Sequence, residues 1–229
     1  MHNEKIFYLI GGPNGSGKTV LSKQIVRTDN VEVLNLDKMA ATRKVSNITA
    51  ARMLLTEDLP RVLSSGQSFV LESTLSGTSD ARIIQMARNH GYRIVFVFAF
   101  LASVEQNIDR VAQRVSMGGH DVDIETIRRR YEKSLHNFHK ILSLADQWLL
   151  FYNGESGKSY KVAYGTNLII NIEHNEYYDL FRENCFEATN RRLTHLAEIG
   201  ASEAQLAAER AGVWVPSIAL NQAFNKKQR

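Results

Sequence analysis

Short apolar runs separated by polar stretches mark the chain as far as about residue 172. Five of them have strand character: Ile6–Ile10, Val31–Leu36, Phe69–Leu71, Arg93–Leu101 and Trp148–Tyr152. The segments Lys161–Tyr164 and Leu168–Ile172 are candidates for further strands. The runs are continuously apolar rather than alternating, which is typical of strands that are buried on both faces of a parallel sheet.

The stretches between these runs repeat their apolar residues at helical spacing. They are Lys18–Arg27, Thr49–Leu63, Ser79–His90, Val104–Ser116 and Ile124–Leu144. Strands that alternate with helices predict an α/β fold, in which a doubly wound parallel sheet carries helices on both faces.

The pattern changes from Glu173 onward, where apolar residues recur every three to four positions. This spacing predicts one long helix that ends at Gly200, a residue type that commonly terminates helices. Ser202 is a suitable N-cap for a second helix that reaches about Ala211. The polar and basic tail 221–229 is expected to be frayed.

The length of 229 residues fits one large domain, or one domain with an appendage. We expect a domain over residues 1–172 and a helical extension over residues 173–229. Hydrophobic residues make up 44% of the chain and charged residues 23%, which excludes wholesale disorder. Lys and Arg outnumber Asp and Glu by 28 to 24, a surplus too small to indicate nucleic acid by itself but suited to a small anionic substrate.

The sequence predicts neither export nor a membrane segment. Cys185 is the only cysteine, which excludes an intramolecular disulfide and a cysteine-rich zinc site. The N-terminal run Ile6–Ile10 lacks the flanks of a signal peptide. The longest apolar run, Ile94–Ala102, has nine residues, whereas a helix needs about 20 to cross a bilayer. We therefore expect a soluble, cytoplasmic protein.

Residues 12–19 carry the most specific chemical signal. They read Gly-Pro-Asn-Gly-Ser-Gly-Lys-Thr, a complete G-x-x-x-x-G-K-[S/T] Walker A motif between a predicted strand and a predicted helix. Glycines let successive N–H groups turn toward phosphate oxygens, and the positive end of the next helix faces the same anion. Lys18 is expected to reach the β- and γ-phosphates of ATP, and the Thr19 hydroxyl to bind Mg²⁺. The candidate nucleotide-binding residues are Gly12, Asn14, Gly15, Ser16, Gly17, Lys18, Thr19 and Val20.

Two acidic residues follow predicted strands at the edge where open α/β sheets bind ligands. Asp37 directly follows the second run. A carboxylate at this place can accept the proton of an acceptor hydroxyl and position that hydroxyl for in-line attack. Glu72 ends the third run and can hold Mg²⁺ through water, or bind substrate hydroxyls together with Thr74. For both acids the alternative is an ordinary cap of the next helix.

Arginines gather around a glycine-rich break between two predicted helices. Arg110 and Arg114 are one helical turn apart, residues 116–120 interrupt the helix, and residues 128–130 are three consecutive arginines. Such an order is typical of a mobile lid whose arginines neutralise charge during phosphoryl transfer. A solvated basic helix face is the alternative.

The three consecutive arginines point in different directions relative to the apolar stripe of the second helix. At about 100° per residue, Arg129 points away from the stripe, while Arg128 and Arg130 flank it. We therefore take Arg114, Arg128 and Arg130 as catalytic lid candidates and assign Arg129 to solvent. His120 lies in the break and is expected to contact substrate or nucleotide.

Taken together, these motifs resemble the zeta-toxin-like family of P-loop kinases. The segments that carry the resemblance are Gly11–Thr19, Leu36-Asp37, Glu72–Gly77, Arg114–Val122 and Ile127–Tyr131. The P-loop is shared by a very large superfamily, whereas Gly-Gly-His followed by Ile-x-Arg-Arg-Tyr is much more specific. The similarity covers about residues 5–170, and Asn153-Gly154 after the fifth run also looks like the compact bacterial branch of this family.

The resemblance implies an ATP-dependent kinase that phosphorylates the 3′-hydroxyl of UDP-N-acetylglucosamine, and a small helical antitoxin that restrains it. By matching position, it makes Asp37 the base, gives Glu72 and Thr74 to the sugar nucleotide, and adds Asn153 to the nucleotide-binding candidates. The chain departs from the family at Ser76, where many zeta toxins carry an arginine that helps to hold the substrate.

We interpret the chain as an adenylate-kinase-like P-loop kinase that uses ATP and Mg²⁺ to phosphorylate a hydroxyl of a small acceptor, such as a sugar nucleotide. Three alternatives stay open. One is a nucleotide-binding ATPase or regulator in which Glu72 ends a Walker B strand. The others are a nucleoside, nucleotide or nucleic-acid-end kinase, and a binding module whose C-terminal helices recruit a partner. No extended basic groove is visible in the sequence, which disfavours long nucleic acid.

Overall fold

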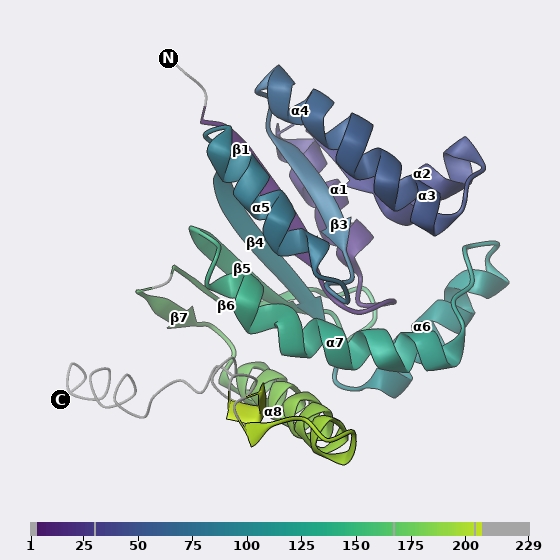
Figure 1. Cartoon of the computed structure of the whole chain (residues 1–229), viewed down its shortest axis with the longest axis vertical. Helices are drawn as coiled ribbons and strands as arrows, with labels where there is room; N and C mark the ends of the chain where they lie inside the picture. Colours follow the sequence, from purple (N-terminus) through teal and green to yellow (C-terminus); the bar gives the residue numbers. More distant parts are fainter. Residues whose placement is uncertain (1–3, 30, 167, 204, 208–229) are drawn as a thin grey trace.

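The computed structural model describes residues 4–29, 31–166, 168–203 and 205–207. Their strands form one seven-stranded sheet in the order β2-β3-β1-β4-β5-β6-β7 (Figure 1). The strands are β1 (Ile6–Gly11), β2 (Glu32–Asn35), β3 (Phe69–Ser73), β4 (Arg93–Phe100), β5 (Gln147–Tyr152), β6 (Tyr160–Gly165) and β7 (Ile170–Ile172). The first five strands along the chain pair in parallel, and they correspond to the five predicted strands.

The last two strands depart from the fully parallel sheet that the sequence predicts. β5 pairs with β6, and β6 with β7, in antiparallel register, so the sheet is mixed. The reason is the length of the connections: a parallel crossover needs a dozen or more residues, and segments 153–159 and 166–169 are much shorter. Both candidate segments contribute a strand, the second of which begins at Ile170.

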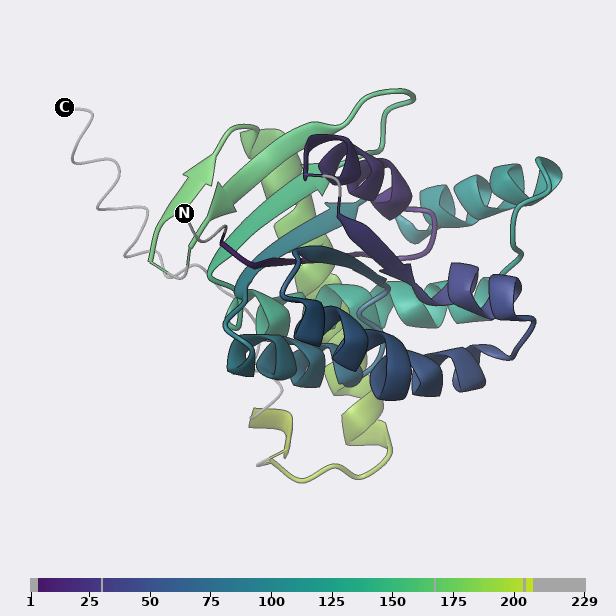
Figure 2. The same cartoon turned by 90° about the horizontal axis from the view of Figure 1, so that it is seen from above.

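Helices cover both faces of the sheet, as the alternating pattern predicts. They are α1 (Lys18–Asp29), α2 (Leu36–Arg43), α3 (Asn47–Met53), the π-helical turn η1 (Leu54–Asp58), α4 (Leu59–Ser65), α5 (Ser79–Asn89), α6 (Val104–Ser116), α7 (Ile124–Leu142) and α8 (Asn175–Glu198). Figure 2 shows α1 on one face and α4, α5 and α7 on the other. Each face has its own apolar core, and the larger core lies under α4, α5, α7 and α8.

The segment after β2 differs most from the prediction. A continuous helix over Thr49–Leu63 is expected, but the structure has α3, η1 and α4 in succession. Proline at the start of α4 has no N–H to donate, and the N–H of Leu59 reaches back five residues to Leu54, which widens the helix into a π-turn. The short α2 was not predicted; the Asn35 side chain caps it by accepting from the Lys38 N–H at 2.9 Å.

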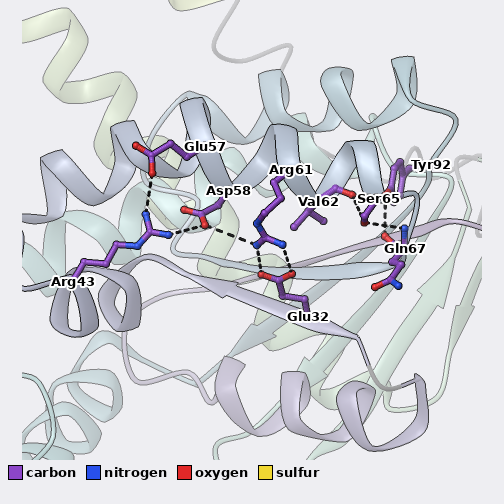
Figure 3. A network of polar contacts seen from close by, with 9 residues as sticks. All are labelled: Glu32, Arg43, Glu57, Asp58, Arg61, Val62, Ser65, Gln67 and Tyr92. Atoms are coloured by element: carbon purple, nitrogen blue, oxygen red, sulfur yellow. Dashed lines mark hydrogen bonds and ion pairs between the residues drawn. The ribbon is translucent and has the colours of Figure 1, made fainter.

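Ion pairs tie these helices to one another and to the edge of the sheet (Figure 3). Arg61 of α4 binds Glu32 of β2, with one nitrogen–oxygen distance of 3.1 Å. Arg43 of α2 donates to the buried carboxylate of Asp58 at 2.7 Å. The helices α2 and α4 are thereby held in place beside β2.

The C-terminal helix α8 shares the main core. Phe181 is 1% exposed, and its ring centroid lies 4.8 Å from that of Phe138 in α7 and 4.9 Å from that of Phe100 in β4. The predicted long helix is therefore confirmed, and a domain boundary at residue 172 stays a prediction. Half of the residues of the second predicted helix, and the whole of the tail, lie outside the described residues. None of the described helices is long and apolar enough to cross a membrane.

Candidate active site

The carboxyl ends of β1, β2 and β3 open into a cavity of about 580 Å³. The P-loop between β1 and α1 forms one wall, α6 and α7 contribute a second, and the segment from α2 to α5 contributes a third. The predicted residues that line it are Asn14, Gly15, Gly17, Lys18, Thr19, Val20, Asp37, Glu72, Thr74, Arg114, His120 and Arg130. The fold thus brings most of the candidate residues to one place.

Two glycines give the P-loop the shape of an anion cradle. Gly15 and Gly17 have φ values of +80° and +91°, which other residues rarely adopt. A Cβ atom on Gly15 would lie 2.7 Å from the backbone oxygen of Asn107, and one on Gly17 would lie 2.7 Å from Nδ2 of Asn153. The loop has no room for side chains here, and this close approach of the backbone fits a phosphate group.

Lys18 is poised for an anion. Its Nζ donates to the backbone oxygens of Gly12 and Pro13, both at 2.8 Å. Burial lowers the pKa of Lys18 to about 8; the nearby Glu72 and Asp37 raise it, and Arg114 and Arg130 lower it. A phosphate would supply the negative charge that this group lacks, so the residues present fit ATP.

The side chain of Glu72 connects the P-loop and α1 to β2 through hydrogen bonds. Its buried carboxylate accepts hydrogen bonds from Ser22 at 2.6 Å, from Asn35 at 2.7 Å and from the Thr19 hydroxyl at 2.9 Å. Among the described residues no cluster of three or more His, Cys, Asp or Glu could hold a metal on its own. The hydroxyl of Thr19 and the carboxylate of Glu72, 2.9 Å apart, offer oxygens of the kind that Mg²⁺ binds when phosphates supply its other ligands.

Asp37 lies in the first turn of α2 and lines the cavity. It is not the cap of that helix, because Asn35 holds the N-cap position. The carboxylate of Asp37 is close enough to Lys18 to raise the pKa of that lysine. The alternative role of Asp37 as a helix cap is thus excluded, and its role as a base stays a prediction.

Three arginines face the cavity from α6 and α7. Arg130 lies 3.5 Å from the Asn14 side chain of the P-loop, measured between NH1 and Oδ1. Arg114 donates to the backbone oxygen of His120 at 2.6 Å, which orders the break between the two helices. Arg110 also lines the cavity, although the prediction did not include it among the site residues.

Arg128 does not join this group, which corrects the expectation for that residue. Its NH1 binds Glu105 of α6 at 3.0 Å, beside a separate cavity of about 340 Å³ bordered by α6, α7 and α8. Two positions along α7 correspond to about 200° around the helix axis, so Arg128 and Arg130 face different sides. Arg129 is exposed, as predicted.

Three other predicted nucleotide-binding residues support the P-loop from behind. Asn153 is buried, and its Nδ2 donates to the backbone oxygen of Ser16 at 2.8 Å, while its own backbone oxygen accepts from Arg110. Ser16 and Gly12 are also buried and do not line the cavity. These residues support the shape of the loop, and their contact with a nucleotide stays a prediction.

Several polar residues of the site have no motif in the sequence that points to them. Asn35 and Ser22 anchor Glu72, and Asp80 of α5 lines the cavity while it is 5% exposed. Among these residues, only Asn35 could have been noticed in the sequence, because asparagine is a common N-cap residue and Asn35 lies near the end of a predicted strand.

Residues 8–138, which include the P-loop and every arginine that faces the cavity, match the AAA domain family. The match covers more than half of the chain. The chain belongs to the AAA domain family. An uncharacterized protein of Haemophilus influenzae is 30% identical to this chain over a match of 137 residues, and the match covers 57% of this chain and 94% of that relative.

Solved structures share the fold of this AAA-domain chain. The AvrRxo1-ORF1:-ORF2 structure with ATP superposes with a TM-score of 0.61 and 17% identity over 93% of this chain and 76% of that chain. The PezAT chromosomal toxin–antitoxin system of Streptococcus pneumoniae gives 0.50 and 14% identity over 81% of this chain and 88% of that one. The predicted α/β fold with a P-loop is confirmed, and the kinase activity and the UDP-N-acetylglucosamine kinase branch stay predictions.

Proposed function

We propose that this protein is an ATP-dependent phosphotransferase that moves the γ-phosphate to a hydroxyl of a small acceptor. One observation carries the proposal: a single cavity holds Lys18 and Thr19 of the P-loop on one wall and the carboxylate-bearing Asp37 on another. Its volume of about 580 Å³ lies in the range of small-molecule sites.

The residues that line the cavity have separate roles in the proposed reaction. Asp37 takes the proton of the acceptor hydroxyl while the oxygen forms a bond to the γ-phosphorus. The bond from that phosphorus to the β–γ bridging oxygen breaks, and the electron pair leaves with ADP. Lys18, Arg114 and Arg130 neutralise the charge on the transferring group. Thr19 and Glu72 would hold Mg²⁺, which supplies further positive charge to the phosphate oxygens.

The test is a metabolite extract that is incubated with the protein and MgATP and searched by mass spectrometry for compounds that gain one phosphate. The wild type should form such a product, and Lys18→Ala should not, because it removes the charge that holds the phosphates. Lys23→Ala is the matched control, since Lys23 is exposed on the same helix. ATP turnover that leaves no phosphorylated product would contradict the proposal and favour the ATPase alternative.

A second candidate is a toxin that phosphorylates a sugar nucleotide and is bound by an antitoxin. The observation in its favour is the shared fold with PezAT, which is a toxin–antitoxin system. UDP-N-acetylglucosamine is the acceptor to assay, and expression in a bacterial host tests toxicity. Growth arrest by the wild type but not by Lys18→Ala would support this candidate, whereas growth with both would count against it. Because ATP is the donor, we place the activity in the cytoplasm.

A further inference from the structure

The cavity has two halves of different character. We call the part formed by the P-loop, α6 and α7 the donor half, and the part formed by α3, η1, the segment after β3 and the start of α5 the acceptor half. The acceptor half is lined by Asn47, Ala51, Leu54, Ser73, Thr74, Ser76, Ser79, Asp80 and Ile83. Hydroxyl and apolar side chains therefore make up most of its surface.

Positive charge is confined to the donor half. Lys18, Arg110, Arg114 and Arg130 all lie there, and none of the described residues that line the acceptor half is a lysine or an arginine. Among the residues just listed for the acceptor half, the ionisable group is the carboxyl of Asp80; the carboxyl of Asp37, the proposed base, also lines the cavity. A phosphate or carboxylate group of an acceptor would lose water in this half without gaining a cation, which is costly.

Asp80 is held in this half by the fold. It is 5% exposed and lies in the first turn of α5, where the helix N-terminus favours a negative charge. Burial raises the pKa of Asp80, and a hydrogen bond from the Ser73 side chain lowers it. A second donor that reaches this carboxyl from the cavity would offset part of the remaining cost of burial.

The segment after β3 is preorganised to orient Ser73. Leu75 is buried with a φ of +52°, an unusual conformation for a residue with a side chain. Its N–H donates to Ser73 Oγ at 3.0 Å, and its backbone oxygen accepts from Asn137 of α7 at 2.7 Å. The Leu75 N–H thereby holds the Ser73 hydroxyl in place, and this hydroxyl donates in turn to Asp80.

We propose that the acceptor half binds a small compound free of phosphate and carboxylate groups, and that Asp80 is the specificity-determining residue that accepts a hydrogen bond from a hydroxyl or amino group of it. The inference rests on the proposed kinase function. It predicts that sugar nucleotides, the acceptors of the second candidate function, are poor substrates, because their phosphates would compete with ATP for the cations of the donor half.

The wild-type protein tests the acceptor class. A metabolite extract is separated on an anion-exchange resin at neutral pH into retained and unretained fractions, and each is incubated with the protein and MgATP. We expect a compound that gains one phosphate in the unretained fraction. Such products in the retained fraction alone would overturn the inference and leave the kinase function intact. Products in neither fraction would overturn both.

The identified acceptor then tests Asp80. Asp80→Asn should raise the KM for the acceptor about tenfold or more, since a hydrogen bond to a charged group is lost, and leave the KM for ATP within about twofold. It should also raise kcat/KM for a phosphorylated analogue relative to the acceptor itself, which a merely structural role would not do. Asp179→Asn, exposed on α8, is the matched control. An unchanged acceptor KM in folded Asp80→Asn would overturn the role of Asp80.

Discussion

Replacing Lys18 with methionine should change how the stability of the protein depends on pH. Lys18 is half-buried among P-loop carbonyl groups. Burial lowers its pKa from 10.5 to about 8. The unfolded chain therefore binds this proton more tightly than the folded protein does, so the stability of the folded state rises as the pH increases through 8 toward 10.5. Methionine keeps the length of the side chain and removes the titration.

The size of the pKa shift of Lys18 determines how much its charge changes the free energy of unfolding. At about 1.4 kcal/mol per pH unit, the charged ammonium costs the folded state about 3 kcal/mol at pH 7. The penalty falls to about 1.4 kcal/mol at pH 9.5, because the folded protein has then released the proton. The contribution of Lys18 to stability should thus improve by about 2 kcal/mol over this range, an upper bound because water screens part of a half-buried charge.

Urea unfolding of both proteins between pH 7 and pH 9.5 measures this effect. The difference in unfolding free energy between the wild type and Lys18→Met isolates the one group, since all other titrations are shared. Added pyrophosphate should abolish the pH-dependent gain of the wild type, because a bound anion restores the pKa of the ammonium. A difference that stays constant within about 0.5 kcal/mol would refute the reasoning that this cation is desolvated in an anion cradle.

Three further substitutions test the site and the core. Asp37→Asn should abolish transfer, measured by product mass spectrometry, and leave calorimetric ATP affinity within about twofold, because an amide cannot take the hydroxyl proton. Arg130→Ala should lower kcat about 100-fold or more, whereas the exposed Arg129→Ala should leave it unchanged. Phe181→Ala should lower the urea-derived free energy of unfolding by about 3–5 kcal/mol, and Phe186→Ala, whose side chain is on the surface, by less than about 0.5 kcal/mol.

Each of these three predictions has an outcome that contradicts it. Near wild-type transfer by Asp37→Asn would remove Asp37 as the base. Equal losses from the two arginine variants would indicate a general effect of charge instead of a contact with the phosphates. Equal stabilities of the two phenylalanine variants would contradict the place of α8 in the core.

Features that depend on contiguous sequence were predictable. The P-loop and its flanking strand and helix follow from one short motif, and α6 begins and ends where the apolar spacing predicts, at Val104 and Ser116. The predicted helical stretch over Thr49–Leu63 is helical throughout, but the proline near the start of α4, whose missing N–H changes the local hydrogen bonding, comes with a π-helical turn that the spacing did not predict.

The candidate site was predictable only in part. The residues at strand ends, such as Glu72, follow from the rule that ligands bind at the carboxyl edge of an open sheet. The bonds from Ser22 and Asn35 to Glu72 join three separate segments, and nothing in the spacing of these residues indicates them. Asn153 was named from the family resemblance, but its bond to Ser16, which supports the P-loop from beyond the end of β5, could be known only from the fold.

The sequence by itself determined the α/β class, the nucleotide motif and a set of arginines that can meet phosphates, because each is written in neighbouring residues. The tertiary structure alone decided that Arg130 faces the cavity while Arg128 binds Glu105, and that the acceptor half holds Asp80 and no lysine or arginine among the described residues that line it. The physical reason is that a few residues along a helix reverse the direction of a side chain, and that the charge of a cavity is a sum over segments far apart in the chain.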